Sequence, residues 1–594
     1  MKMFAVILPL LCFMVLLKRD RLRESFLDSA VALGVFVVIS TEALSLLLML
    51  DYAQIVVCWF LCLLALVVWK YRHRCNTDCP KLAIPETTMF QKIMLTLMLC
   101  VVTITGITAV VAAPNNFDSL TYHLPRMMHW IQNRSVEHYP THIDRQLWMA
   151  PFAEYVIMHL QILSGGDRFA NCVQWFSMIG SGVAASLIVR ELHGSRNSQI
   201  IAASLSVSIP MGLLQSTSTQ NDYVVSFWLV CLTYYVIKAK EHPGIKNTLY
   251  LSLSLALAIF TKGTAYLVAV PFMLLYLWFT LSSGLKTTLT NILIIVLAVF
   301  VINGGHYARN IKLYENPISP ASGNGLTCKR VDPASAISGV TKNIAIQLTT
   351  AAGELNNALL AATKKIHNAI RVDVNDSDLT EGRGFFMLPK AVLYSEDFAP
   401  NPFHMAVMLL SAALLIVRRG KYSRETILLA IATISSFIIL SAGIKWNLFI
   451  SRIFLSVFVI SAPCIALLYD EVKLRFFINY CAIICLLVSF NVLLNNTMRP
   501  LTGEKSVFVT DRIDQYFMVN PRAKPYFIAT TNMIKRQPLS NIGILDRDGN
   551  MWEYILWVLL KENGVHYRIE HVNVENGSGR IRLEGFSKYF PVQI

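Results

Sequence analysis

Long apolar segments recur along most of this 594-residue chain and limit what it can fold into. A helix needs roughly 20 apolar residues to cross a bilayer core of about 30 Å. The runs are continuous instead of alternating, which favours helices over a membrane barrel. We therefore expect an all-α polytopic membrane bundle of about 12–14 transmembrane helices. Fourteen segments are candidates, at 3–17, 27–50, 53–70, 91–113, 170–190, 199–215, 221–238, 248–261, 265–283, 288–304, 403–418, 425–443, 449–469 and 476–495.

The composition indicates lipid as the main solvent, with 55% hydrophobic residues, 15% charged residues and a mean hydropathy of +0.51. The net charge of +15 could suggest nucleic acid. However, the basic residues form short clusters between apolar runs and no stripe with interleaved aromatics, so no nucleic-acid partner is expected.

Most cysteines lie inside apolar runs, which implies no disulfide framework. Cys75 and Cys79 with His73 could hold a metal, but the cluster is small.

Basic residues near the segment ends orient the bundle, because short cytoplasmic loops collect Lys and Arg. If every segment spans, these clusters share one face, which is then cytoplasmic. The large hydrophilic pieces all fall on the opposite, exoplasmic face. The basic clusters are Lys18/Arg19/Arg21/Arg23, Lys70/Arg72/Arg74, Arg190/Arg196, Lys238/Lys240/Lys246 and Arg418/Arg419/Lys421/Arg424.

Five regions follow from this pattern. In the hydrophilic insertion at 305–402, apolar residues from Ile337 to Ile370 recur every three or four positions. This spacing predicts an amphipathic helical stretch that lies on the outer membrane surface or caps the bundle. In the hydrophilic tail at 496–594, the pattern predicts strands at 541–546 and 566–574 on either side of a helix at 551–562, and therefore a small α/β domain. The regions are extra N-terminal transmembrane helices (1–90), a transmembrane core (91–304) with a first exoplasmic loop (114–169), the exoplasmic insertion (305–402), C-terminal transmembrane helices (403–495) and the exoplasmic α/β tail (496–594).

The loop 114–169 is dense in titratable residues. Asp118 lies a few residues beyond the fourth apolar segment, where a carboxylate can be partly desolvated and still reach a substrate head group. It is a candidate general base, and a solvated Asp that caps the next helix is the alternative. His123, Arg126 and Arg145 of the same loop are candidate substrate ligands.

Two further candidates flank later segments. Asp222 starts a span, and a helix N-cap is its simpler explanation. Lys262 interrupts a long apolar stretch, and an ionisable group near the membrane costs roughly 2.5–3.5 kcal/mol if it is deeply placed. A phosphate would offset this cost. Snorkelling at a helical hairpin is the alternative.

The remaining candidates follow the tenth segment and precede the eleventh. Arg309 suits bidentate binding of a phosphate, with His306 beside it, although both could be interfacial anchors. Glu396 and Asp397 fall on the same face, although loop structure alone could account for them.

All of these candidate residues map to one side of the membrane. Such carboxylates and cations suit attack by an activated nucleophile on a substrate whose leaving group is a lipid phosphate. No Walker-type loop, Rossmann fingerprint or HExxH motif is present in the sequence.

These residues resemble the GT-C membrane glycosyltransferases, particularly the protein O-mannosyltransferases and lipid A aminoarabinose transferases. Asp118 is similar to the acidic position in that superfamily's first exoplasmic loop. Phe260-Thr-Lys262-Gly is similar to the "LTKG" helical pair of bacterial members, and Tyr307-Ala-Arg309-Asn310 with Asn316-Pro317 is similar to their "RN…GNP" segment. Ser119 follows Asp118 where many eukaryotic relatives carry a second acid.

The resemblance implies inverting transfer of a sugar from a polyprenyl-phosphate donor to a glycan, lipid or protein acceptor, on the exoplasmic side of the cell membrane. Asp118 would deprotonate or orient the acceptor, and Asp222 would assist it. Lys262 and Arg309, with Arg126 or Arg145, would neutralise the departing phosphate. No cofactor is firmly implied, and a divalent metal stays open.

Two alternatives stay open beside this enzyme. A lipid-linked sugar flippase or other transporter would show internal repeats and broken helices that bind substrate at mid-membrane, and neither is clear in the sequence. A polysaccharide polymerase or ligase also uses lipid-linked sugars on the outer face. A donor with a diphosphate-linked oligosaccharide would favour the polymerase or ligase.

Overall fold

The computed structural model describes residues 5–73, 86–320, 325–382, 385–389, 392–537, 541–561, 567–581 and 590–592. Cys75 and Cys79 of the candidate metal cluster lie outside these residues. Within them, nine helices are long and apolar enough to cross a membrane by length and composition. They are α3 (Leu22–Leu46), α4 (Tyr52–Arg72), α5 (Met89–Val111), α9 (Cys172–Glu191), α12 (Asp222–Glu241), α14 (Thr264–Leu281), α15 (Leu285–Tyr314), α19 (Arg424–Gly443) and α22 (Arg475–Leu494).

Shorter helices complete the bundle, and each predicted apolar segment contains at least one helix among the described residues. The predicted segment 199–215 is divided in two, because Pro210 lacks the N–H that would continue the helix and restricts the residue before it. The all-α polytopic bundle is confirmed. The shorter apolar helices are α2 (Ile7–Leu16), α13 (Ile245–Ile259), α18 (Pro402–Val417) and α21 (Leu455–Leu467), and the divided segment holds α10 (Arg196–Val207) and α11 (Pro210–Gln215).

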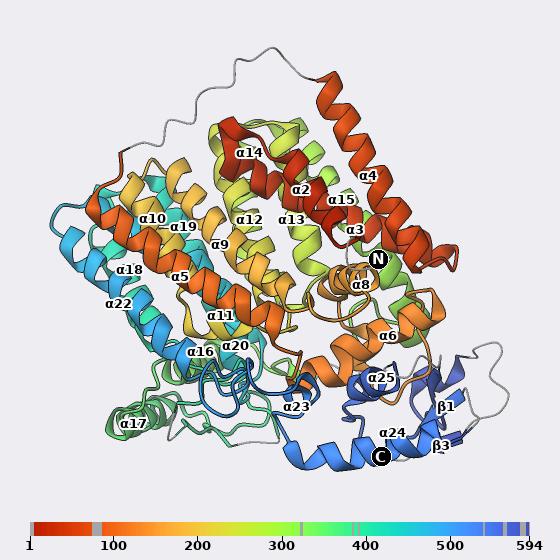
Figure 1. Cartoon of the computed structure of the whole chain (residues 1–594). Coiled ribbons are helices and arrows are strands. Elements are labelled where there is room, and N and C mark those ends of the chain that lie inside the picture. Colours follow the sequence, from red (N-terminus) through yellow and green to blue (C-terminus); the bar gives the residue numbers. More distant parts are fainter. Residues whose placement is uncertain are drawn as a thin grey trace.

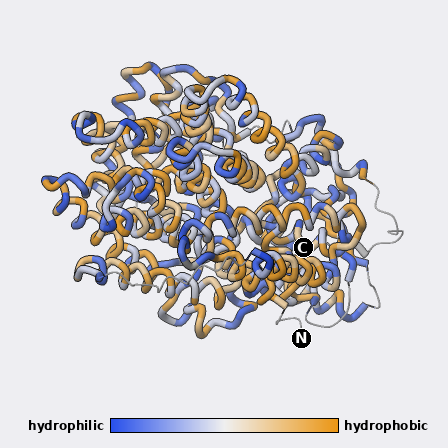
Figure 2. The backbone as a smooth tube through the Cα atoms, turned by 90° about the horizontal axis from the view of Figure 1, so that it is seen from above, coloured by the Kyte–Doolittle hydropathy of each residue, from blue (hydrophilic) through white to orange (hydrophobic). Residues whose placement is uncertain are grey.

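Burial separates central helices from peripheral ones. In the most apolar window of α12, 94% of the residues are buried, whereas the figure is 11% for α4. Helix α12 packs against α9, α13, α14 and α21 and is hydrophobic around its circumference, as expected of a helix at the bundle centre. Hydrophobic residues occur across the whole cross-section of the bundle (Figure 2). Large ones such as Leu293 and Phe300 are exposed, which fits apolar surface turned toward lipid.

The hydrophilic regions gather at one end of the bundle (Figure 1). The tail carries a small parallel sheet of order β2-β1-β3, so the predicted strands and helix of the tail are present. The elements at this end are a π-helical turn (Ser119–His123), α6 (Leu124–Asn133), α7 (Arg145–Trp148), α8 (Phe152–Ser164), α16 (Pro333–Gln347), α17 (Gly353–Ile370), α20 (Ile450–Ile453), α23 (Arg512–Tyr516), α24 (Lys524–Lys535), β1 (Asn541–Ile544), α25 (Glu553–Lys561), β2 (Arg568–His571) and β3 (Phe590–Val592).

The tail packs tightly against the first loop. Helix α25 contacts α6 and the π-helical turn. The Gln515 side chain accepts a hydrogen bond from the backbone N–H of Ala113 at 2.9 Å, and Arg512 pairs with Asp167 at 2.7 Å. Buried tail residues such as Tyr554 belong to the same hydrophobic core as the bundle. The tail therefore helps to hold the loop that follows α5.

The predicted amphipathic stretch of the insertion forms two helices, α16 and α17. The buried side of α16 includes the polar residues Ser338, Lys342 and Asn343, whereas Ile337 is exposed. Leu355 of α17 is also exposed. Some apolar side chains thus face outward on both helices, while others, such as that of Ile346, are buried against the bundle.

Candidate functional site

Asp118 lies at the start of the π-helical turn, directly after the segment that leaves α5. Nearby, the Asn116 side chain accepts a hydrogen bond from the backbone N–H of Ser119 at 2.7 Å, which fixes the start of the turn. The Oδ2 atom of Asp118 lies 2.8 Å from Nη2 of Arg452. Arg452 comes from the short helix α20, far along the chain.

Arg452 joins two carboxylates. Its Nη1 atom lies 2.9 Å from Oδ1 of Asp397, while Nη2 faces Asp118. Gln220 supports this arrangement, because its side-chain oxygen accepts a hydrogen bond from Nη1 at 2.5 Å and its amide nitrogen donates to Asp397 at 2.9 Å. A guanidinium binds carboxylate and phosphate oxygens with the same paired N–H geometry, so its chemistry also suits a substrate anion.

Asp222 and Lys262 form a second ion pair, with Nζ 2.5 Å from Oδ1. The N-cap of α12 is Asn221 and Asp222 is the first helical residue, so the N-cap explanation of Asp222 does not hold. Its other carboxylate oxygen is buried without a partner. Lys262 lies in the turn between α13 and α14, where the charges of Arg452 and Asp118 also act on it.

We call Asp118, Asp222, Lys262, Asp397 and Arg452 the Asp118 cluster. Four of its side chains retain partial exposure: 13% for Asp118, 16% for Arg452, 20% for Asp397 and 21% for Lys262. Asp222 is nearly buried behind Lys262. The cluster therefore offers both signs of charge to a ligand that arrives at this end of the bundle.

The two carboxylates beside Arg452 have opposite pKa shifts. Burial opposes ionisation of Asp118, but the charges of Arg452 and His123 outweigh it, so the pKa of Asp118 is lowered. Burial raises the pKa of Asp397 to about 6, to which the neighbouring charges of Glu396 and Asp118 contribute. Asp118 is thus a stable carboxylate, while Asp397 can exchange a proton near neutral pH.

Arg145 lies at the edge of the cluster. Its guanidinium carbon is 5.1 Å from the centre of the Tyr122 ring, and its charge contributes to the low pKa of Asp118. Arg145 also donates to the backbone oxygen of Gly549 and to the side chain of Asn550. The tail thus contacts a residue that acts on Asp118.

His123 and Arg126 point into the protein interior and do not join the cluster. Both contact Oε1 of Glu154, at 2.5 and 2.8 Å, and all three side chains are almost fully buried. Arg126 also donates to the backbone oxygens of Met149 and Ala150. This arrangement braces α6 against α8.

The other predicted residues are also occupied by protein partners. Arg309 forms a two-pronged pair with Glu42, at 2.8 and 2.7 Å. His306 contacts the backbone oxygen of Trp148 at 3.0 Å. Glu396 pairs with Arg499 at 2.7 Å. These two side chains have no exposed surface. The structure therefore brings Asp118, Asp222, Lys262 and Asp397 together, with Arg145 at the edge, and does not add the other candidates.

Comparisons with known proteins bear on the fold. The chain is similar to the crystal structure of ArnT from Cupriavidus metallidurans bound to undecaprenyl phosphate, with a TM-score of 0.50 and 11% identity over 82% of this chain and 87% of that one. It is also similar to the oligosaccharyltransferase AglB from Archaeoglobus fulgidus, with a TM-score of 0.38 and 13% identity over 79% of this chain and 64% of AglB. No curated protein matches the chain significantly.

The chain has a GT-C fold. The predicted resemblance to this superfamily is thereby confirmed at the level of architecture. Residues 149–304 also match the family model described as dolichyl-phosphate-mannose-protein mannosyltransferase. This part of the GT-C bundle includes Asp222 and Lys262, whereas Asp118, Asp397 and Arg452 lie outside the matched range.

Sequence reasoning missed Arg452 and Gln220. Arg452 falls inside 449–469, which was expected to be a single span, and the chain instead forms the short helix α20 before α21. A lone arginine in an apolar run was a usable signal, because a charge at membrane depth generally has a partner. Gln220, a neutral residue two positions before Asp222, gave no comparable signal.

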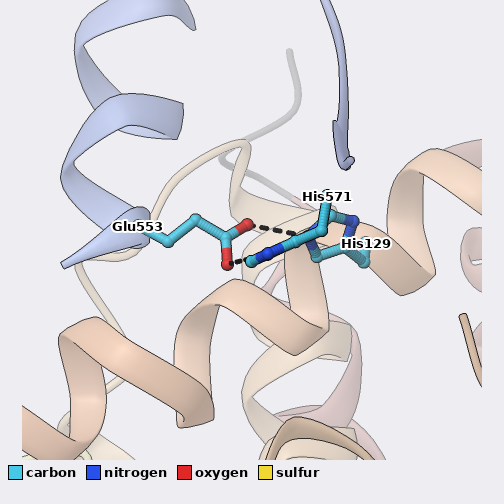
Figure 3. A group of neighbouring side chains, drawn as sticks. All are labelled: His129, Glu553 and His571. Atoms are coloured by element: carbon cyan, nitrogen blue, oxygen red, sulfur yellow. Dashed lines mark hydrogen bonds and ion pairs between the residues drawn. The ribbon is translucent and has the colours of Figure 1, made fainter. Parts of the chain in front are cut away.

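One group among the described residues has metal-ligand chemistry, namely His129, Glu553 and His571 (Figure 3). The Nε2 atoms of the two histidines lie 2.7 and 3.2 Å from the Glu553 carboxylate, which also accepts hydrogen bonds from Gln146 and Trp557. Four N–H donors therefore satisfy this buried carboxylate. The backbone N–H of His142 donates to Nδ1 of His571 at 3.4 Å, which places the His571 proton on Nε2 and leaves that atom no lone pair for a metal. The group fits a latch between α6 and the tail, not a metal centre.

Proposed function

We propose that this protein is a membrane glycosyltransferase that moves a sugar from a polyprenyl-phosphate donor to an acceptor at the Asp118 cluster, on the exoplasmic face of the cell membrane. The observation that supports it best is the accessible grouping of Asp118 and Asp397 around Arg452, beside Lys262. Nucleophile activation and phosphate departure need these two kinds of group within one site. The GT-C fold and the matched family model support the same class.

The cations suit the donor phosphate. In its described contacts, the Lys262 ammonium makes one hydrogen bond, to Asp222, so two of its three N–H groups are available to a phosphate. Arg452 adds a planar guanidinium that binds phosphate oxygens in pairs. The structure of ArnT with undecaprenyl phosphate supports a lipid-phosphate carrier as the donor class.

The carboxylates suit the acceptor. In the proposed step, a hydroxyl or amine of the acceptor attacks the anomeric carbon from the side opposite to the phosphate. The bond between that carbon and the phosphate oxygen breaks, and the polyprenyl phosphate leaves with the electron pair. Asp118 holds the attacking group by its charge. The proton of the attacking group passes to Asp397, whose pKa of about 6 suits a proton acceptor at neutral pH.

Reconstitution tests this proposal. The protein is placed in liposomes with a panel of radiolabelled polyprenyl-phosphate sugars, a labelled diphosphate-linked oligosaccharide, and a membrane extract as the source of acceptors. We expect transfer by the wild type, and Asp118→Asn should lower the rate by roughly 10²–10³-fold while the protein stays folded, because the charge that holds the attacking group is lost. Asp511→Asn is the matched control, because Asp511 is an exposed aspartate at the same end of the bundle.

Each outcome has a definite meaning. Normal transfer by Asp118→Asn would remove Asp118 from the reaction. If no donor is consumed but labelled lipid crosses the bilayer, the protein is a flippase. If only a diphosphate-linked oligosaccharide is consumed, it is a polymerase or ligase.

A further inference from the structure

An amphipathic groove of about 710 Å³ lies between α5, α9 and α10, toward the end of the bundle opposite to the Asp118 cluster. Its polar end holds Arg23, which reaches in from α3, together with Arg196 and Gln199. The rest of the groove is lined mainly by apolar side chains, such as those of Leu99 and Ile200. A cavity with one cationic end and an apolar body matches a lipid with an anionic head group.

The two arginines at the polar end lack carboxylate partners. Arg23 donates to the side chains of Ser186 and Gln199, at 3.1 and 3.0 Å, and Arg196 donates to a backbone oxygen at 3.2 Å. In the described part of the chain, no acidic oxygen lies within ion-pair distance of either. Arg190 nearby is different, since it pairs with Glu24 and Glu191. Positive charge therefore remains for a ligand where the groove begins.

The length of the groove fits one leaflet of a bilayer. Along α10 it extends from Arg196 to Val207. At 1.5 Å per residue this distance is about 16 Å, close to half of a hydrocarbon core of about 30 Å. Leu99 of α5 is 64% exposed, so the groove opens toward lipid.

We infer that the groove binds an anionic glycerophospholipid from the leaflet at the basic end of the bundle. Its phosphate lies between Arg23 and Arg196, and an acyl chain follows the apolar wall formed by α5 and α10. Basic pockets between transmembrane helices bind anionic head groups in this way. The polyprenyl carrier of the proposed reaction is a different ligand, because the Asp118 cluster lies at the other end of the bundle. The inference does not depend on that reaction.

Lipid retention tests the inference. The full-length protein is reconstituted in nanodiscs of phosphatidylcholine and phosphatidylglycerol with added polyprenyl phosphate, extracted in mild detergent with or without free glycerol phosphate, and analysed by native mass spectrometry. We expect one retained phosphatidylglycerol per wild-type chain. Arg23→Gln with Arg196→Gln should lower retention by about 25-fold, since each charge contributes about fivefold. Ala203→Phe, which fills the apolar part of the groove, should also lower it with both arginines in place.

The control removes two charges elsewhere at the basic end, by Arg418→Gln with Lys421→Gln. These residues pair with Glu471 outside the groove, and retention should stay at the wild-type level. Equal retention by the wild type and the Arg23/Arg196 variant would overturn the inference. So would unchanged retention by Ala203→Phe, retention of polyprenyl phosphate instead, or displacement by free glycerol phosphate, which would show an anion site without a lipid.

Discussion

Glu396 and Asp397 are neighbours in the chain, and each pairs with an arginine, yet they belong to different kinds of site. Asp397 and Arg452 keep 20% and 16% of their side chains exposed, while Glu396 and Arg499 keep none. The first pair is open to a ligand and the second is sealed by protein. Charge type alone therefore does not identify a functional residue at this end of the bundle; access does.

The sealed pair supports the open one. Arg499 also donates to the side chains of Asn115 and Thr217, at 2.7 and 3.1 Å. Asn115 is close in sequence to Asp118, and Thr217 is close to Gln220. One buried guanidinium thus connects the tail to three of the loops that carry the Asp118 cluster.

The largest effect should come from breaking the sealed pair. Arg499→Met leaves the Glu396 carboxylate buried without a counter-charge, which should lower the free energy of unfolding by about 3–5 kcal/mol. Thermal unfolding in detergent would measure the loss. The double variant with Glu396→Gln should recover part of it, because the unpaired charge is gone. Wild-type stability of the single variant would contradict the structural role of this pair.

Breaking the open pair should mainly lower the transfer rate, whereas breaking the sealed pair mainly lowers stability. Arg452→Met removes a cation proposed to bind the donor phosphate, so the transfer rate should fall by about 10²–10³-fold. Stability should fall less than in Arg499→Met, since Asp118 and Asp397 keep contact with solvent. Initial rates and melting temperatures of the two variants, measured side by side, give the comparison. A folded Arg452→Met protein with normal transfer would show that the open pair is also structural.

A third change tests whether the buried Glu553 group holds the tail against the loop that carries the open site. Glu553→Gln keeps the shape of the side chain, but its amide nitrogen cannot accept from the donors around it. We expect the free energy of unfolding to fall by about 1–3 kcal/mol and proteolysis of the tail to become faster. Glu575→Gln is the control, because Glu575 is exposed in the same region. Equal proteolysis of both variants would argue against the latch.

The smallest effect concerns pH and sharpens the role assigned to Asp397. Its pKa is raised to about 6, so the carboxylate is protonated below that pH and cannot accept a proton. The transfer rate should fall about tenfold for each pH unit below this value. A pH profile of the initial rate would show the inflection, which Asp397→Asn should abolish and Asp511→Asn should retain. An inflection that persists in Asp397→Asn would assign it to another group.

The bundle could be predicted from the sequence because the bilayer fixes the length of an apolar helix. The partners of the charged residues could not. Arg309 has the side-chain chemistry of a phosphate ligand, but it forms an ion pair with Glu42 of α3. Arg452 was hidden in an apolar run, since one charge changes the average hydropathy of a long segment little.

The sequence by itself determined that the chain crosses a membrane many times and that its hydrophilic regions belong to one end of the bundle. These properties depend on local composition, because apolar segments partition into lipid and polar segments into water. Only the tertiary structure decided which charges are open and which are sealed, because that depends on segments from distant parts of the chain. Arg499 reaches Glu396 and seals it, while Arg452 meets Asp118 and Asp397 where solvent still enters.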